Sequence, residues 1–186
     1  MALPSKTAEI TTWCTPLDKG KALTIREVVL FGVLGALTFA LQIVMAPLPN
    51  IEPVSLLVML FAAVFGLKSL YAVYVFVMME VLFHGIGLWN INYLYIWTVL
   101  AVLALMLRNM ESPLAWALLS GAFGLCFGAL CGIVDVFIGG FSYAVAKWIS
   151  GIPFDLLHCA GNFCIALVLW KPLRSLVEKL HRKMTR

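Results

Sequence analysis

Polar side chains that could bind a ligand occur in four short groups of an otherwise apolar chain. The first group is Asn50 and Glu52, in a segment (47–53) that holds three prolines. A loop stiffened by proline needs little further ordering when it captures a ligand. Glu52 would equally favour the positive end of a helix that begins just after it. The segment is therefore either a capture loop or a helix start.

The second group is Glu80 and His84, which lie four residues apart in the third apolar run. This spacing places both side chains on one face of a helix, where they can form an ion pair. The pair could serve stability alone or take part in proton coupling. Proton coupling would need a series of such groups across the membrane, and the other half of the run has none.

The third group places amides among aromatic rings between residues 89 and 97. Its candidates for ligand contact are Trp89, Asn92, Tyr93 and Trp97, of which Trp89, Asn92 and Trp97 are favoured. Trp and Tyr favour membrane interfaces, so an aromatic belt is one interpretation. Amides beside flat rings are also typical of a pocket for a planar, polar small molecule. Both interpretations stay open.

The fourth group is Asp155, His158 and Asn162, whose spacing of three and four residues gives one helical stripe. We favour ligand contact for this stripe over helix capping by Asp155. Lys147 precedes it, with Tyr143 close by in sequence. Lys147 could pair with Asp155 or meet an anionic group of a ligand.

Composition indicates which kind of fold must position these groups. The chain of 186 residues is 63% hydrophobic and 12% charged, with a mean hydropathy of +1.01. Soluble domains carry about 25% charged residues. The apolar runs are continuous rather than alternating, which argues against a β-barrel. The sequence therefore predicts an all-α integral membrane protein.

Six apolar runs predict six transmembrane helices within one membrane domain, residues 25–170. A cytoplasmic segment, 1–24, precedes the domain, and a basic helical tail, 171–186, follows it. The expected spans are 25–45, 54–66, 69–83, 93–107, 114–138 and 154–170. The expected external loops are 47–53, 84–92 and 139–151. All four polar groups then lie toward the external side.

The distribution of Lys and Arg predicts the orientation of these spans. Twelve of the thirteen fall at the two ends or in every second loop, and Lys147 is the exception. Excess Lys and Arg in short loops marks the cytoplasmic side. Both termini are thus expected in the cytoplasm of a multi-pass plasma-membrane protein. The net charge of +4 follows from this topology and does not indicate a nucleic-acid partner.

Small residues recur every fourth position in two spans. The first series is Gly32, Ala36 and Ala40, and the second is Gly124, Gly128 and Gly132. This spacing stacks small residues on one helix face, where another helix can approach closely. We expect the second series to pack inside the protein. For the first series, packing against another protein competes with internal packing.

The one-sided polar groups favour capture of a molecule from outside over conduction. A channel or a solitary transporter should continue a polar path to the other side. No nucleophile–base pair or metal-spaced cluster indicates an enzyme. A solitary secondary transporter is the main alternative, and a membrane enzyme is less favoured.

In these features the chain resembles the substrate-binding S component of energy-coupling factor (ECF) transporters. The resemblance covers roughly residues 25–170. It rests on size, six spans, the Ala36–Ala40 spacing and the Pro-Asn-Ile-Glu-Pro-Val-Ser segment, 49–55. It implies a prokaryotic protein that binds a vitamin or related micronutrient at its outer side.

The same resemblance implies partners. S components dock on a membrane T component held by two cytoplasmic ATPases, through the small-residue face of the first span. Ala36 and Ala40 match that motif, and Gly32 extends it by one turn. The chain has no phosphate-binding Gly-x-x-x-x-Gly-Lys loop, so the partner ATPases would use the ATP. No cofactor of its own is expected.

Overall fold

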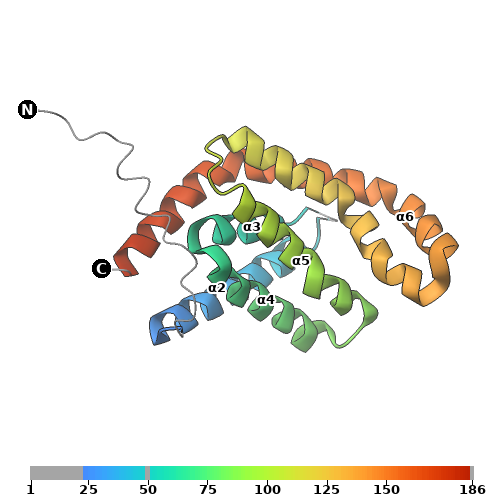
Figure 1. Ribbon diagram of the computed structural model, residues 1–186, viewed down its shortest axis with the longest axis horizontal. Coiled ribbons are helices and arrows are strands. Elements are labelled where there is room, and N and C mark those ends of the chain that lie inside the picture. Colours follow the sequence, from blue (N-terminus) through green and yellow to red (C-terminus); the bar gives the residue numbers. More distant parts are fainter. Residues whose placement is uncertain (1–22, 49–50, 185–186) are drawn as a thin grey trace, which may run out of the picture.

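All regular elements of the described part of the protein, residues 23–48 and 51–184 of a computed structural model, are helical (Figure 1). They are α2 (Ile25–Met45), α3 (Val54–Phe65), the 3-10 helix η2 (Gly66–Lys68), α4 (Ser69–His84), α5 (Leu88–Met106) and α6 (Pro113–Met184). Four helical stretches are long and apolar enough to cross a membrane: Ile25–Met45, Val54–His84, Leu88–Met106 and Pro113–Lys183. The all-α prediction, with helices suited to a membrane, is confirmed at this level. Asn50 lies outside the described residues.

Two helix starts follow from local capping. Thr24 accepts a hydrogen bond from the Glu27 N–H, and the Glu27 carboxylate accepts one from the Thr24 N–H at 2.9 Å. This capping box fixes the start of α2 at Ile25. At α5 the Gly87 N–H donates to the Asn90 side chain at 2.5 Å. The helix therefore begins at Leu88, and the expected loop 84–92 is reduced to residues 85–87.

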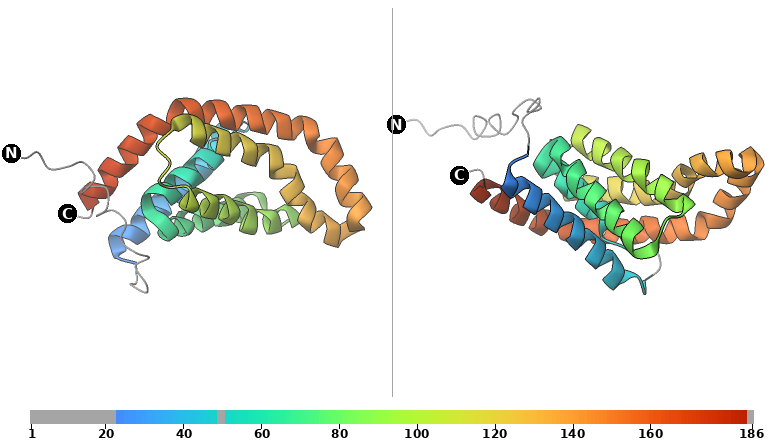
Figure 2. Two further views of the ribbon diagram at one scale, coloured as in Figure 1. Left: turned by 45° about the horizontal axis from the view of Figure 1, so that its top comes forward. Right: turned by 90° about the horizontal axis from the view of Figure 1, so that it is seen from below.

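The long helix α6 reverses direction at Gly140, whose φ of 81° is suited to glycine. We call residues 113–139 the first arm and residues 141–184 the second arm. The arms run side by side (Figure 2), and the rings of Trp116 and Trp170 stack at 4.0 Å between them. The expected loop 139–151 is wrong, because only Gly140 leaves the helical conformation. Pro153 also lies inside the second arm rather than ahead of it.

The predicted tail, 171–186, is helical as far as Met184 and continues the second arm through Pro172. It returns to the start of the bundle, where the rings of His181 and Phe65 lie 5.1 Å apart. Nearby, the Arg174 side chain donates to the Met110 carbonyl at 3.1 Å. The tail therefore packs against the helices rather than extending away from them.

Charged residues divide the molecule into two ends. Lys68 pairs with Glu27 at 2.7 Å, so the α3–α4 turn lies beside the start of α2. The turn 107–112 and the C-terminal part of α6 lie at this end too, on the left of Figure 1. Every Lys and Arg that the structure describes, other than Lys147, belongs to these segments. We call this the basic end; residues 46–48 and 51–53, the turn 85–87 and Gly140 lie opposite.

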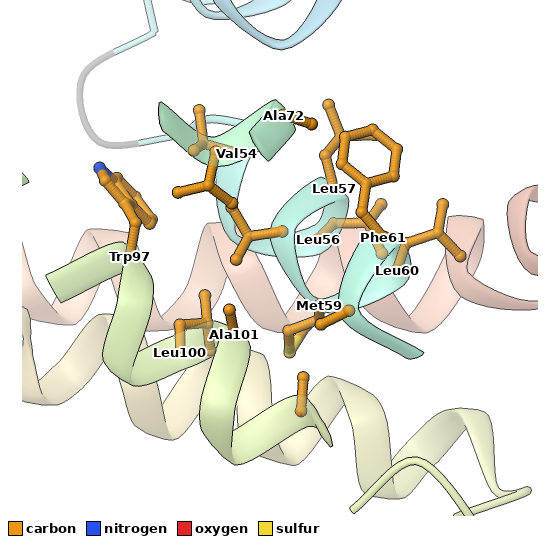
Figure 3. Close-up of a cluster of buried hydrophobic side chains, with 14 of the residues drawn as sticks. Val54, Leu56, Leu57, Met59, Leu60, Phe61, Ala72, Trp97, Leu100 and Ala101 are labelled. Carbon is orange, nitrogen blue, oxygen red and sulfur yellow. The ribbon is translucent and has the colours of Figure 1, made fainter. Parts of the chain in front are cut away.

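The core is built around α3, the shortest α-helix among the described residues. Every residue from Val54 to Ala62 is buried. Figure 3 shows these side chains between Ala72 of α4 and the Trp97–Ala101 stretch of α5. A helix that is apolar all round must be covered on all sides. The length of α3, 12 residues, suits a central position within the bundle.

Close helix contacts confirm part of the small-residue prediction. A Cβ atom at Gly124 would lie 2.9 Å from the His158 backbone, and one at Gly128 would meet the Asp155 carboxylate. Both glycines therefore let the two arms of α6 approach. A Cβ at Gly132 would have nothing within 4 Å, so this third member takes no part in the contact.

Candidate functional site

The first and fourth polar groups meet at Glu52 and His158. Glu52 directly precedes the Pro53 N-cap of α3, and its neighbour Ile51 lies against Gly161 of the second arm. This contact brings the Glu52 Oε1 atom to 3.7 Å from the His158 Nε2 atom. His158 is buried, at 5% exposure, and Glu52 is mostly buried, at 17%. The separation is too long for a direct hydrogen bond, so His158 Nε2 is left without a partner.

The second group adds another carboxylate to the same region. Glu80 pairs with His84 at 3.0 Å, as the four-residue spacing predicts. The pair uses Glu80 Oε2 and leaves the buried Oε1 without a hydrogen bond. Burial, and after it the negative charge of Glu80, raise the pKa of Glu52 to about 7.

An aromatic row leads along α5 to these ionisable groups. Trp89 and Tyr93 meet edge to face at 5.2 Å, and Tyr93 and Trp97 at 5.5 Å. Phe127 of the first arm lies 5.8 Å from Trp97 and 4.9 Å from His158. Trp97 is fully buried, with an unpaired indole N–H. In Figure 3 this nitrogen points away from Leu100 and Ala101. A residue of an interfacial aromatic belt would face lipid, which Trp97 does not.

We call Glu52, Glu80, Tyr93, Trp97 and His158 the Glu52 cluster. The Tyr93 side chain lies within electrostatic range of both carboxylates. The cluster joins the loop before α3 with α4, α5 and the second arm of α6. It combines two carboxylates, an imidazole and two aromatic rings, several of whose polar atoms are buried and unpaired. Such atoms are costly in an apolar interior unless a ligand or water binds them.

The Asp155 stripe is confirmed as a single buried face. Asp155, His158 and Asn162 are exposed by 6%, 4% and 1%. Asn162 holds elements together, because its Nδ2 donates to Ser55 Oγ at 3.0 Å and to the Ser120 carbonyl at 3.4 Å. Asp155 Oδ1 accepts the Gly128 N–H at 3.0 Å, while Oδ2 is unpaired. Of the three, His158 is the one placed against Glu52.

Asn92 lies outside the aromatic row. Its Oδ1 atom is 3.1 Å from the Tyr95 hydroxyl, which also lies 2.5 Å from the Leu130 carbonyl. These contacts tie α5 to the first arm of α6. Asn92 therefore has a structural partner within the protein, whereas Trp89, Tyr93 and Trp97 share a different face of α5.

Lys147 pairs with Asp135, a residue that the sequence offered as a further candidate for ligand contact. Its Nζ atom is 2.6 Å from Asp135 Oδ1, and the ring of Tyr143 lies 5.8 Å away. Asp135 is 5% exposed and Lys147 is 54% exposed. The alternative pairing with Asp155 is not formed, because the reversal at Gly140 brings residue 147 back against residue 135. Lys147 and Tyr143 thus form a separate contact beside the bend of α6.

Replacing Lys147 with Met is expected to lower the melting temperature of the purified protein. Asp135 would remain buried without its cation, which costs about 1–3 kcal/mol for an unpaired buried group. The double variant Lys147→Met, Asp135→Asn should recover most of this loss, because it removes both charges. Thermal unfolding followed by tryptophan fluorescence measures both. An unchanged melting temperature in the single variant would contradict a structural role for the pair.

Two contributors to this region were missing from the predicted site. Gln42 of α2 has a side-chain contact with Tyr93, and its Oε1 atom is buried and unpaired. A lone Gln in an apolar span is a signal that the sequence did offer. Phe127 completes the aromatic row, but an isolated Phe in a membrane helix carries no such signal. Within the described ranges, no group of three or more His, Cys, Asp or Glu could hold a metal ion.

Comparisons with known proteins add no relative to this picture. No family model, curated protein or solved structure matches the chain.

Proposed function

We propose that the protein is the substrate-binding subunit of an ECF-type importer in a prokaryotic plasma membrane. It captures a vitamin-like small molecule from outside and delivers it through a membrane T component and two cytoplasmic ATPases. The observation that carries this proposal is the Glu52 cluster. Buried, unpaired polar atoms beside aromatic rings are what a small, polar and partly flat ligand requires.

A membrane topology with six crossings fits the distribution of charge. The crossings are α2, α3, α4, α5 and the two arms of α6. The basic end then faces the cytoplasm together with both termini. The Glu52 cluster faces the outer half of the membrane, where a ligand arriving from outside would reach it.

The apolar core between the two ends supports capture rather than conduction. Val54 to Ala62 of α3 are buried, and all but Ser55 are apolar. Ser55 is already hydrogen-bonded to Asn162. A conducting path would need polar groups along this length. Delivery of the ligand to the cytoplasm therefore calls for a partner.

The outward face of α2 supplies a docking surface for that partner. Gly35 is the residue that packs internally, because a Cβ there would lie 2.6 Å from the Ala72 carbonyl. Gly32 and Ala36 are half-buried and Ala40 is exposed. A Cβ at Gly32 would meet nothing within 4 Å. We call Gly32, Ala36 and Ala40 the docking face, which a T component could approach closely.

The test is to purify the protein in lipid nanodiscs and search for a bound small molecule by native mass spectrometry. We expect about one ligand per chain, and its loss in His158→Phe, which keeps the ring contact with Phe127 but removes the unpaired nitrogen. Val168→Ala, at an exposed position of the second arm, is the control. If neither the wild type nor any supplied micronutrient shows binding, the capture function fails. Uptake by proteoliposomes that lack ATPases would favour a solitary transporter instead.

A further inference from the structure

The Glu52 cluster and its surroundings carry an excess of negative charge. Four carboxylates lie in this half of the molecule: Glu52, Glu80, Asp135 and Asp155. Two of them have a side-chain partner of their own, because Glu80 pairs with His84 and Asp135 with Lys147. In the part of the chain that the structure describes, no Lys or Arg pairs with the other two.

His158 is the group that faces Glu52, but the two side chains do not form a hydrogen bond with each other. The 3.7 Å gap leaves His158 Nε2 without a hydrogen bond although the side chain is 95% buried. In the tautomer with its proton on Nδ1, a neutral imidazole offers an acceptor at Nε2, and Glu52 offers carboxylate oxygens. Both acceptors suit a ligand group with two or more N–H donors. Asp155 Oδ2, one helical turn away, is a third unpaired acceptor.

The rings beside these acceptors also suit a cation. Tyr93 lies within electrostatic range of Glu52 and Glu80, Trp97 meets Tyr93 edge to face, and Phe127 links Trp97 to His158. Faces of aromatic rings attract cations, and the attraction grows when water is excluded. A flat ring would stack in the same surroundings. An anionic ligand, in contrast, would lie close to two buried carboxylates.

Lys147 does not alter this balance. Its charge is matched by Asp135 at 2.6 Å, and its side chain is half exposed beside the bend of α6. Lys147 could bind an anion only if it lost its ion pair with the buried Asp135. The charge that a ligand meets at the Glu52 cluster is therefore negative.

We propose that the ligand of the Glu52 cluster is a flat heterocycle or aromatic ring that carries a positively charged nitrogen group, held between Glu52 and His158. This inference rests on the proposed capture function and names its substrate class. The charged nitrogen donates to Glu52 and to His158 Nε2, and the ring lies against Tyr93 and Trp97. Asp155 adds to the negative field one helical turn away.

The experiment compares two flat probes of similar shape and opposite charge, benzamidine and benzoate. Purified protein in nanodiscs is titrated with each, and the shift in melting temperature gives the Kd. We expect benzamidine to stabilise the protein with a Kd at least tenfold lower than that of benzoate. Glu52→Gln should weaken benzamidine about tenfold or more, and Asp155→Asn should weaken it by a smaller factor.

Glu178→Gln serves as the matched control, because Glu178 lies at the basic end in a pair with Arg174. It should leave both affinities unchanged. The inference is overturned if benzoate binds more tightly, if benzamidine does not stabilise the protein, or if Glu52→Gln and Asp155→Asn both bind benzamidine as the wild type does. Tight binding of benzoate would contradict a cationic ligand but would agree with the proposed capture function. If the mass-spectrometry test finds no co-purified ligand and no binding of a supplied micronutrient, the capture function itself is contradicted.

Discussion

Replacing Ala36 or Ala40 with Trp is expected to reduce uptake of the ligand to background while its affinity for the isolated protein stays unchanged. Both positions lie on the docking face of α2, which is directed away from the internal contact at Gly35. Helix association in lipid depends on close backbone approach, and a Trp side chain prevents it. Neither residue is part of the Glu52 cluster, so ligand binding should not change.

Cells that express the complete transporter provide the measurement, as accumulation of labelled ligand, with ligand affinity determined separately on the purified subunit. Val168→Trp is the matched control, because this residue is 69% exposed on the second arm of α6, away from the docking face. It should transport normally. Equal uptake by wild type, Ala36→Trp and Ala40→Trp would show that the partner docks elsewhere.

Four-residue spacing predicted which small residues share a helix face, but not which helix packs against that face. Gly32, Ala36 and Ala40 form one face of α2, and the residue that packs against α4 is Gly35, between them in sequence. In the same way Gly124 and Gly128 meet the second arm of α6, whereas Gly132 does not. The partner of a small-residue face depends on the position of the next helix, which periodicity does not contain.

Helix bounds were predictable where local chemistry decides them. The expected span 25–45 equals α2, because a capping box starts the helix and Pro47 follows its end. The segment 139–151 was expected to be an external loop, with the last span starting after Pro153. Only Gly140 departs from the helix. Membrane helices tolerate Gly and Pro when neighbouring segments satisfy the backbone.

In the candidate site too, local contacts were predictable from the sequence, whereas contacts between distant segments were not. The ion pair of Glu80 with His84 and the stripe from Asp155 to Asn162 follow from helical periodicity alone. The meeting of Glu52 with His158 joins residues 106 positions apart and depends on how the helices pack. The partner of Lys147 changed from Asp155 to Asp135 because the chain reverses at a single residue, Gly140.

Affinity for benzamidine is expected to fall roughly tenfold between pH 8 and pH 6, because Glu52 loses its charge over this range. Burial and the nearby charge of Glu80 raise the pKa of Glu52 to about 7. Above pH 7 the carboxylate is ionised and attracts the cation. Below pH 7 a proton occupies it, and the cation must compete with that proton. Benzamidine itself stays positively charged at both values.

The Glu52→Gln variant separates this effect from other titrating groups around Glu52. His158 of α6, Glu80 of α4, with its partner His84, and Tyr93 of α5 remain in the variant. Its affinity should be low and nearly constant between pH 6 and pH 8. Calorimetry in buffers with different ionisation enthalpies should show proton release on binding to the wild type at pH 7. A pH dependence of the same size in Glu52→Gln would assign the titration to His158 or Glu80, and stronger binding at pH 6 would contradict a cationic ligand at Glu52.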